Sequence, residues 1–274
     1  MILGGTVTGE FKTPEEWEEL LIRSGFKAIT APFCCEDDEN LIRKYMDIIE
    51  RNHVKISEIG VWRNILIGQD IDYAVNQLKL ADKLGIECCV NIVGTVSSLS
   101  WDAADVSNFT DDNYVTIVKS IRQVIDKAAP TKAYYTVEPM PWMIPDGPDV
   151  YLKLIDDVDR ERFAVHMDFV NMINSPRRFL CACDFVEDCF KKLSPFIKST
   201  HIKDSRMNLT KYTTHIDECP PGEGNLDYPK ILQILDKYLP KDGAILLEHM
   251  STFEEYDKAF KYVKNAAEKA GVEV

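Results

Sequence analysis

The stretch AYYTVEPMPWMIPDGPDVYLKLIDDVDRERFAVHMD, residues 133–168, contains two short apolar segments separated by a stretch with helical periodicity. The segments Ala133–Glu138 and Arg162–Asp168 contain β-branched and aromatic residues typical of strands. Strand, helix and strand in this order form the unit of a parallel sheet, because parallel neighbours need a long crossover connection. Both segments end in an acidic residue, so this unit places two carboxylates at one edge of the predicted sheet.

Comparable apolar segments recur along the chain, each followed by a stretch with the period of a helix. Eight alternations without a change of composition predict an α/β fold, a closed (β/α)8 TIM barrel that forms a single domain over residues 1–274. An open doubly wound sheet is the alternative, but Gly4-Gly5 does not supply its glycine-rich turn G-x-G-x-x-G. The predicted strands are Ile2–Val7, Phe26–Thr30, Val54–Gly60, Ile86–Val93, Ala133–Glu138, Arg162–Asp168, Ile197–Ile202 and Ala244–His249.

Helix boundaries and loops fit the same pattern. Thr13-Pro14 predicts a helix start, and Gly25, Gly85 and Gly271 predict helix ends. The longest loops should follow the fourth, sixth and seventh strands, on the face of a barrel where active sites are built. These loops are Gly94–Asp111, Phe169–Cys181 and Lys203–Asn225.

Composition restricts the class of protein. Hydrophobic residues make up 45% of the 274 residues, enough for a large core, and the formal net charge of -13 opposes binding to nucleic acid. The N-terminus lacks the basic region of a signal peptide, and no stretch approaches the about 18 apolar residues of a membrane span. We therefore expect a cytoplasmic protein that binds neither nucleic acid nor membrane, with its eight cysteines as free thiols.

The last four predicted strands each end in a side chain that can bind a metal ion. Singly, each has a structural interpretation: Glu138 can pair with a lysine, Asp168 can cap a helix, and His201 can be a hydrogen-bonded core histidine. A barrel directs them to one point, where three carboxylates would repel one another unless a divalent cation binds them. The predicted ligands are Glu138, Asp168, His201 and Glu248, a donor set that favours Mn²⁺, Mg²⁺ or Co²⁺, with Mn²⁺ the first choice.

Over nearly its whole length the chain resembles the xylose isomerase-like TIM barrel superfamily, which includes sugar phosphate isomerases and epimerases. The resemblance implies that the four predicted ligands bind the metal, and that Glu138 and Glu248 also act as acid and base on opposite faces of the substrate. It is carried by VEPMPW around Glu138, VHMDFVN around Asp168, HIKDS around His201, PGEGNLDY at 221–228 and LLEHM around Glu248.

Substrate-binding residues are less well defined. Asn171 stands where epimerases of this kind usually have a histidine, and Arg206 only loosely matches their substrate-binding arginine. His166 and Lys203 each lie two residues from a predicted ligand and share its inward face, so they are candidates for contact with substrate. A buried structural histidine and an ion pair of the lysine are the alternatives. Trp142 is placed either to pack against a sugar or to seal the barrel.

The expected reaction is proton abstraction beside a carbonyl, with the resulting enediolate stabilised by the metal. Return of the proton to the opposite face would epimerise a sugar or cyclitol, and its delivery to the adjoining carbon would isomerise it. The sequence leaves three alternatives open: a lyase that resembles the α-subunits of C-glycoside deglycosidases and works with a small β-subunit, an AP endonuclease-like repair enzyme, and a non-catalytic sugar-binding protein. The resemblance also implies a homo-oligomer and a small-molecule sugar substrate.

Overall fold

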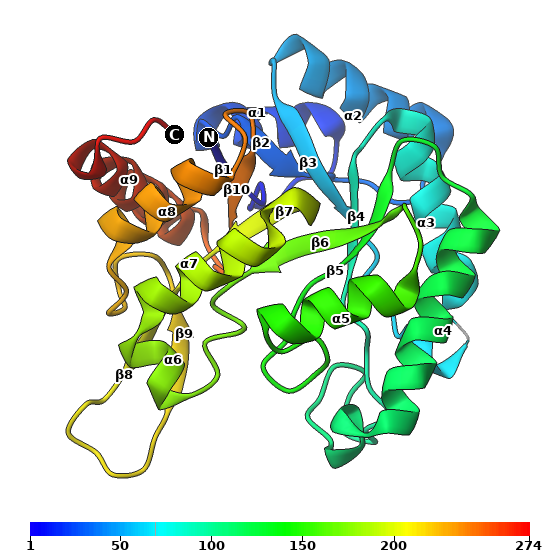
Figure 1. Cartoon of the computed structure of the whole chain (residues 1–274). Coiled ribbons are helices and arrows are strands. Elements are labelled where there is room, and N and C mark those ends of the chain that lie inside the picture. Colours follow the sequence, from blue (N-terminus) through cyan, green and yellow to red (C-terminus); the bar gives the residue numbers. More distant parts are fainter. Residues whose placement is uncertain (69) are drawn as a thin grey trace.

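The structure, a computed structural model, describes residues 1–68 and 70–274. In this part of the chain, eight parallel strands close into a barrel in the order β1-β10-β7-β6-β5-β4-β3-β2 (Figure 1). The predicted (β/α)8 barrel is therefore confirmed. The barrel strands are β1 (Ile2–Gly5), β2 (Ala28–Thr30), β3 (Lys55–Gly60), β4 (Cys88–Asn91), β5 (Tyr134–Val137), β6 (Phe163–Asp168), β7 (Ile197–Ile202) and β10 (Ala244–Leu247).

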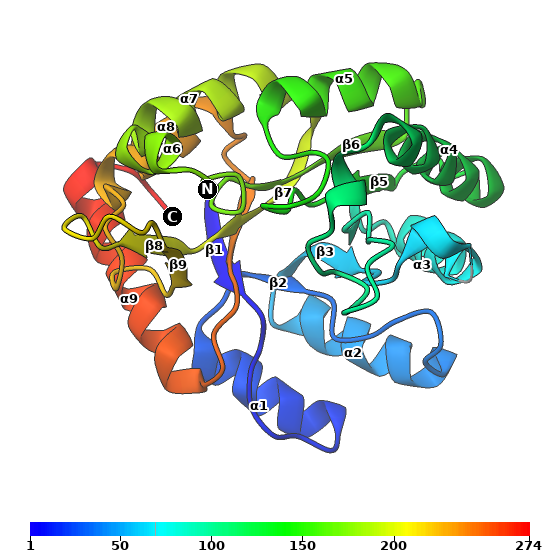
Figure 2. The same ribbon diagram turned by 90° about the horizontal axis from the view of Figure 1, so that it is seen from below.

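Helices surround the barrel on its outside, as the view down the strands in Figure 2 shows. Their ends follow local capping rules: the Thr13 side chain accepts a hydrogen bond from the backbone N–H of Glu16 at the start of α1, and Gly25 ends it in the left-handed conformation. The helices are α1 (Pro14–Ser24), α2 (Glu39–Arg51), α3 (Ile71–Leu84), α4 (Asp111–Ala128), α5 (Pro148–Val158), α6 (Pro176–Leu180), α7 (Ala182–Leu193), α8 (Tyr228–Tyr238) and α9 (Phe253–Ala270), with short 3-10 turns at Ile65–Ile67, Val106–Phe109 and Ser194–Phe196.

Several strands are shorter than predicted because pairing stops where a neighbour ends. The last pair between β1 and β10 is Gly5 with Leu247, so Thr6 and Val7 continue beyond the sheet. At the end of β10 the backbone of His249 adopts a left-handed conformation with φ 58°, which turns the chain out of the strand.

The expected loops contain elements that were not predicted. Helix α6 lies within Phe169–Cys181, and the 3-10 turn Val106–Phe109 lies within Gly94–Asp111. The expected loop Lys203–Asn225 contains an antiparallel hairpin of β8 (Asp204–Met207) and β9 (Ile216–Cys219), in which Asp204 pairs with Cys219. Figure 1 shows this hairpin protruding beside α6. Its strands are short and mostly polar, so no apolar run indicated them.

The interior of the barrel changes from apolar to polar along β10. On β10, Ala244 and Leu246 face inward and pack with Ala28, and the next residue of the same face is Glu248. The strands approach closely at this apolar end: a Cβ on Gly4 would lie 1.7 Å from the carbonyl oxygen of Ala28. Polar side chains are thus collected at the carboxyl ends of the strands.

All eight cysteines are free thiols, as expected from the sequence. None of the helices in the described residues has the length and apolar character needed to cross a membrane.

Candidate metal site

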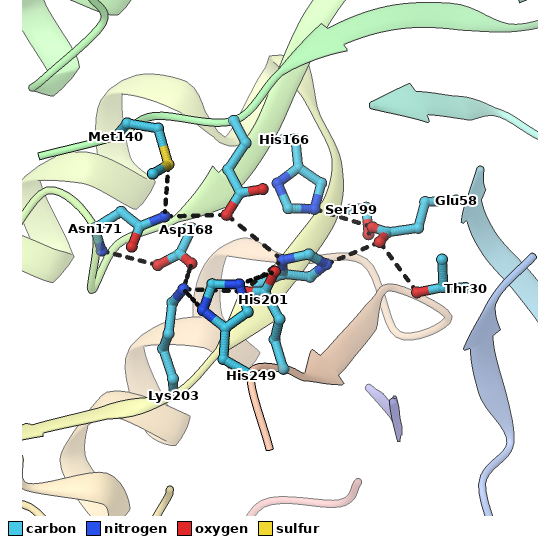
Figure 3. Close-up of polar contacts among 12 residues, drawn as sticks. Thr30, Glu58, Met140, His166, Asp168, Asn171, Ser199, His201, Lys203 and His249 are labelled. Carbon is cyan, nitrogen blue, oxygen red and sulfur yellow. Dashed lines mark hydrogen bonds and ion pairs between the residues drawn. The ribbon is translucent and has the colours of Figure 1, made fainter. Parts of the chain in front are cut away.

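Four side chains that the sequence predicts as ligands converge at the carboxyl ends of neighbouring strands. Glu138 follows β5, Asp168 ends β6, His201 lies on β7 and Glu248 follows β10, and these four strands are adjacent in the barrel. Each residue offers a ligand atom, and these atoms all lie within 4.8 Å of one another. Figure 3 shows the polar contacts around this cluster, with Asp168 and His201 labelled. The barrel geometry thus brings the whole predicted set together.

The chemistry of this cluster fits a divalent ion. Nδ1 of His201 is buried and lies 3.0 Å from Oε2 of Glu248 and 3.6 Å from Oε1 of Glu138, yet it makes no hydrogen bond to any residue that the structure describes. Buried polar atoms are normally hydrogen-bonded, so an atom of this kind aimed at carboxylates marks a position that a bound group would complete. One imidazole and three carboxylates supply a mixed set of nitrogen and hard oxygen donors.

Lys203 also lies inside the cluster. Its ammonium is fully buried, 2.9 Å from Oδ2 of Asp168, 2.9 Å from Oε2 of Glu248 and 3.0 Å from Oε2 of Glu218. Burial lowers the pKa of this lysine, but the surrounding carboxylates outweigh burial and raise the pKa well above its ordinary value. Lys203 is therefore a charged group that partly neutralises the acidic cluster.

The acidic groups respond differently to the same surroundings. Burial raises the pKa of Asp168 to about 6, against the attraction of Lys203 and with the help of the neighbouring glutamates. Burial also raises the pKa of Glu248, but His201 and Lys203 reverse this effect and hold the pKa well below its ordinary value. Glu248 therefore stays ionised more readily than Asp168.

A cavity of about 680 Å³ opens beside the cluster. Its wall includes Met140, Trp142 and Asn171 from the loops after β5 and β6, and Glu218 of β9. His249, which follows Glu248, also lines it. This volume and the mixture of apolar and polar walls are typical of a site for a small organic molecule.

The family model that describes the xylose isomerase-like TIM barrel matches residues 19–272. The chain belongs to this family. Nearly the whole barrel is thus covered, including the four converging side chains. No curated protein matches the sequence at a significant level.

Solved structures of other proteins share the fold at low sequence identity. A xylose isomerase-like TIM barrel protein from Mycobacterium smegmatis, in complex with magnesium, is 15% identical with a TM-score of 0.71, covering 98% of this chain and 97% of that chain. A 3-keto-D-glucoside 4-epimerase from E. coli is 14% identical with a TM-score of 0.69, covering 97% and 99%. The probable 3-DHS dehydratase from Bacillus anthracis is 16% identical with a TM-score of 0.73, covering 97% and 99%.

The predicted substrate-binding residues of this xylose isomerase-like barrel lie in different environments. Trp142 lines the cavity, where its Nε1 donates a hydrogen bond to the backbone oxygen of Asp102, 2.8 Å away. Lys203 lies among the carboxylates. It forms an ion pair with Glu248, which is the alternative that the sequence left open for this lysine. His166 is completely buried, and Arg206 is exposed and outside the described lining of the cavity. Trp142 therefore lines the cavity, whereas His166 and Arg206 are not among its described lining residues.

Asn171 supports two of the predicted ligands. Its side-chain Nδ2 donates to Oε1 of Glu138 at 3.0 Å, and its backbone N–H donates to Oδ1 of Asp168 at 2.9 Å. The asparagine that departs from the epimerase pattern thus orients both carboxylates.

Sequence reasoning missed three residues at this site, Glu58, Glu218 and His249. Nδ1 of His249 lies 2.8 Å from Oε1 of Glu218, its Nε2 lies 3.1 Å from Oε1 of Glu248, and these contacts raise its pKa to about 10. Glu58 lies behind His201 and its signal was present in KISEIG, residues 55–60, as a single acidic residue within an apolar strand. Glu218 and His249 had no comparable signal, because they depend on the hairpin and on a left-handed backbone.

Proposed function

We propose that this chain is a metal-dependent isomerase or epimerase that acts on a keto sugar or cyclitol. The observation that carries the proposal is the convergence of Glu138, Asp168, His201 and Glu248 beside a cavity of about 680 Å³. A structural relative that is a 3-keto-D-glucoside 4-epimerase supports the choice of substrate class. Mn²⁺ is our first choice of ion, and the magnesium in the Mycobacterium smegmatis relative supports a hard divalent cation.

The ion would be held by the four converging residues and would supply a Lewis acid that stabilises negative charge on a substrate oxygen. The protein's own contribution is to bind and move a proton. Glu248, a carboxylate 3.1 Å from the cavity-lining His249, would accept a proton from a carbon beside a carbonyl.

Glu138 is suited to return the proton to the substrate. It follows β5, whereas Glu248 follows β10, and β6 and β7 separate the two strands in the barrel. The two carboxyl groups would therefore reach a substrate from different strands of the barrel. A proton returned from the Glu138 side to the same carbon would invert that centre, and a proton returned to the adjoining carbon would interconvert aldose and ketose.

Exchange of carbon-bound hydrogen in D₂O tests this proposal. The protein, loaded with Mn²⁺, is incubated with a panel of free, phosphorylated and 3-oxo sugars, and deuterium incorporation is followed by NMR. We expect incorporation at one carbon beside the carbonyl, with a loss of at least about 100-fold in rate for Glu138→Gln. The matched control is Glu87→Gln, which changes a glutamate paired with Lys198 at 3.1 Å and outside the cluster.

Two results would contradict the proposal. No exchange with any sugar, together with ligand binding that is unchanged in Glu138→Gln, would indicate a sugar-binding protein without catalytic activity. The second result is release of a substituent from a 3-oxo-glycoside in a reaction that needs a second protein chain. This result would show that the protein is a lyase and not an isomerase. The molar mass of the same purified protein, measured by light scattering, tests the expected homo-oligomer.

A further inference from the structure

A second polar network lies deeper in the barrel, directly behind His201. Glu58 of β3 is completely buried, and its Oε1 lies 2.8 Å from Nε2 of His201. Its Oε2 accepts a hydrogen bond from Oγ of Ser199 at 2.5 Å and lies 2.9 Å from Nε2 of His166. Figure 3 shows Glu58 on the side of the His201 ring opposite to Asp168 and Lys203.

A buried carboxylate of this kind needs a reason for its presence, because burying a charge without partners costs several kcal/mol. Glu58 has four polar partners, since Oγ1 of Thr30 also donates to Oε1 at 3.2 Å. A buried carboxylate acceptor is thus fixed behind one face of the candidate metal site.

The two nitrogens of His201 therefore have different surroundings. Nε2 is engaged by Glu58, whereas Nδ1 points toward Glu138 and Glu248 without a hydrogen bond among the described residues. A histidine that binds a metal through one nitrogen commonly donates its other N–H to a carboxylate, which fixes the tautomer and the direction of the ring. We infer that Glu58 is a positioning residue that holds His201 with Nδ1 directed at the ion, an inference that rests on the proposed metal-dependent function.

His166 completes this support. Its ring lies edge to face against the ring of His201, with centroids 4.1 Å apart and an interplanar angle of 80°. Both rings contact the carboxylate of Glu58. If the His201 ring rotated about its side-chain bonds, it would lose its hydrogen bond to Glu58 and press against the ring of His166. The buried histidine that the sequence singled out as a candidate for substrate contact is thus a packing partner of a predicted ligand.

Glu58, His166 and His201 are also close enough to hold a second ion. We favour the positioning role for two reasons. The three residues are at most 3% exposed, and the contacts at 2.8 and 2.9 Å are those of hydrogen bonds between imidazole and carboxylate. In addition, His201 would have to bind two ions through its two nitrogens. A second ion is therefore an outcome that the experiment must detect.

The experiment compares metal binding by the wild type and Glu58→Gln, a change that keeps the shape of the side chain and removes its charge. Mn²⁺ affinity is measured by competition with a fluorescent chelator, and the absorption spectrum of bound Co²⁺ reports the geometry of the ligands. We expect Glu58→Gln to bind Mn²⁺ about 10- to 100-fold more weakly, with an altered Co²⁺ spectrum. The matched control is Glu87→Gln, the same substitution at a glutamate that pairs with Lys198 at 3.1 Å and lies outside both clusters, and it should leave both readouts unchanged.

A second variant keeps the inference testable if Glu58→Gln does not fold, as judged by its urea unfolding curve. Ser199→Ala removes one hydrogen bond to Glu58 without changing charge, and it should weaken Mn²⁺ binding in the same direction but less strongly. Unchanged affinity and spectrum in a folded Glu58→Gln variant would overturn the inference. The inference would also be overturned if the wild type bound two ions per chain and the His166→Ala variant bound only one. None of these readouts uses a sugar, so failure of the proposed reaction would be seen separately, in the D₂O exchange.

Discussion

The ammonium nitrogen of Lys203 lies 2.9 Å from Oδ2 of Asp168, inside the cluster that we assign to a metal ion. The same nitrogen lies 2.9 Å from Oε2 of Glu248. Two of the four predicted ligands therefore share a buried cation that belongs to the protein itself. A bound ion and Lys203 would compete for the same carboxylate oxygens, and this competition has measurable consequences.

We predict that Lys203→Met destabilises the metal-free protein more than the metal-loaded protein. Removal of one partner from a buried ion pair typically costs about 3 to 5 kcal/mol, because the remaining charge has no partner. With Mn²⁺ bound, the ion supplies the missing positive charge, so the loss should be smaller, and Mn²⁺ should bind more tightly than in the wild type. Urea unfolding with EDTA and with Mn²⁺ measures both effects. Equal destabilisation in the two conditions would show that Lys203 and the ion do not share a site.

Asp204 should organise the loop beside the hairpin. Its carboxylate accepts hydrogen bonds from the backbone N–H groups of Ser205, Gly222, Gly224 and Leu226 at 2.8 to 3.2 Å. We predict that Asp204→Ala lowers the free energy of unfolding by about 2 to 4 kcal/mol, since hydrogen bonds to charged groups are among the stronger ones. Amide hydrogen exchange should increase at residues 220–226.

Gly224 provides an independent check on the same loop. A Cβ at this position would lie 2.1 Å from Oδ1 of Asp204, so Gly224→Ala should increase exchange in the same residues. Metal affinity should change much less than exchange in both variants, because neither residue belongs to the four-ligand cluster. Unaltered exchange in both variants would contradict the role of Asp204.

Asp82 should contribute a pH-dependent part of the stability. Its Oδ1 accepts hydrogen bonds from the backbone N–H groups of Thr131, Lys132 and Ala133. Burial raises the pKa of Asp82, but these bonds outweigh burial and leave the pKa below its ordinary value. A carboxyl group with a lowered pKa in the folded state stabilises the protein above its unfolded pKa, about 3.9, and this stabilisation is lost as the pH falls through the folded value.

We therefore predict that Asp82→Asn is less stable than the wild type at pH 7 and that the difference shrinks below about pH 4. Urea unfolding over this pH range measures it. Asp72→Asn is the matched control, because Asp72 forms an exposed ion pair with Lys127 and should change stability little at any pH. A difference for Asp82→Asn that is constant with pH would exclude this assignment.

The parts of the site that the sequence predicted are those that depend on strand ends alone. Glu138, Asp168, His201 and Glu248 each follow or end an apolar segment, and the closure of the barrel brings them together. Glu58 was missed because it lies within a strand, and its partners His166 and His201 are 108 and 143 residues away in the sequence. Contacts of this range are created by the closed barrel, so the acidic residue within the apolar segment KISEIG did not by itself indicate its partners.

The hairpin was missed for a different reason. Its strands hold few apolar residues, and Glu218 reaches the site only because β9 lies against β8, next to Lys203. The position of the hairpin therefore depends on tertiary packing more than on the strand preferences of its amino acids.

The central claim is that the ends of β5, β6, β7 and β10 bind one divalent ion, and its most direct test is the stoichiometry of Mn²⁺ after loading and gel filtration. Elemental analysis of the wild type, Asp168→Asn and His201→Ala, each checked for folding by circular dichroism, provides the comparison. We predict about one ion per chain in the wild type and a loss of at least about 10-fold in Mn²⁺ affinity in each folded variant. A wild-type protein that retains no divalent ion, or folded variants that bind Mn²⁺ as tightly as the wild type does, would contradict the account.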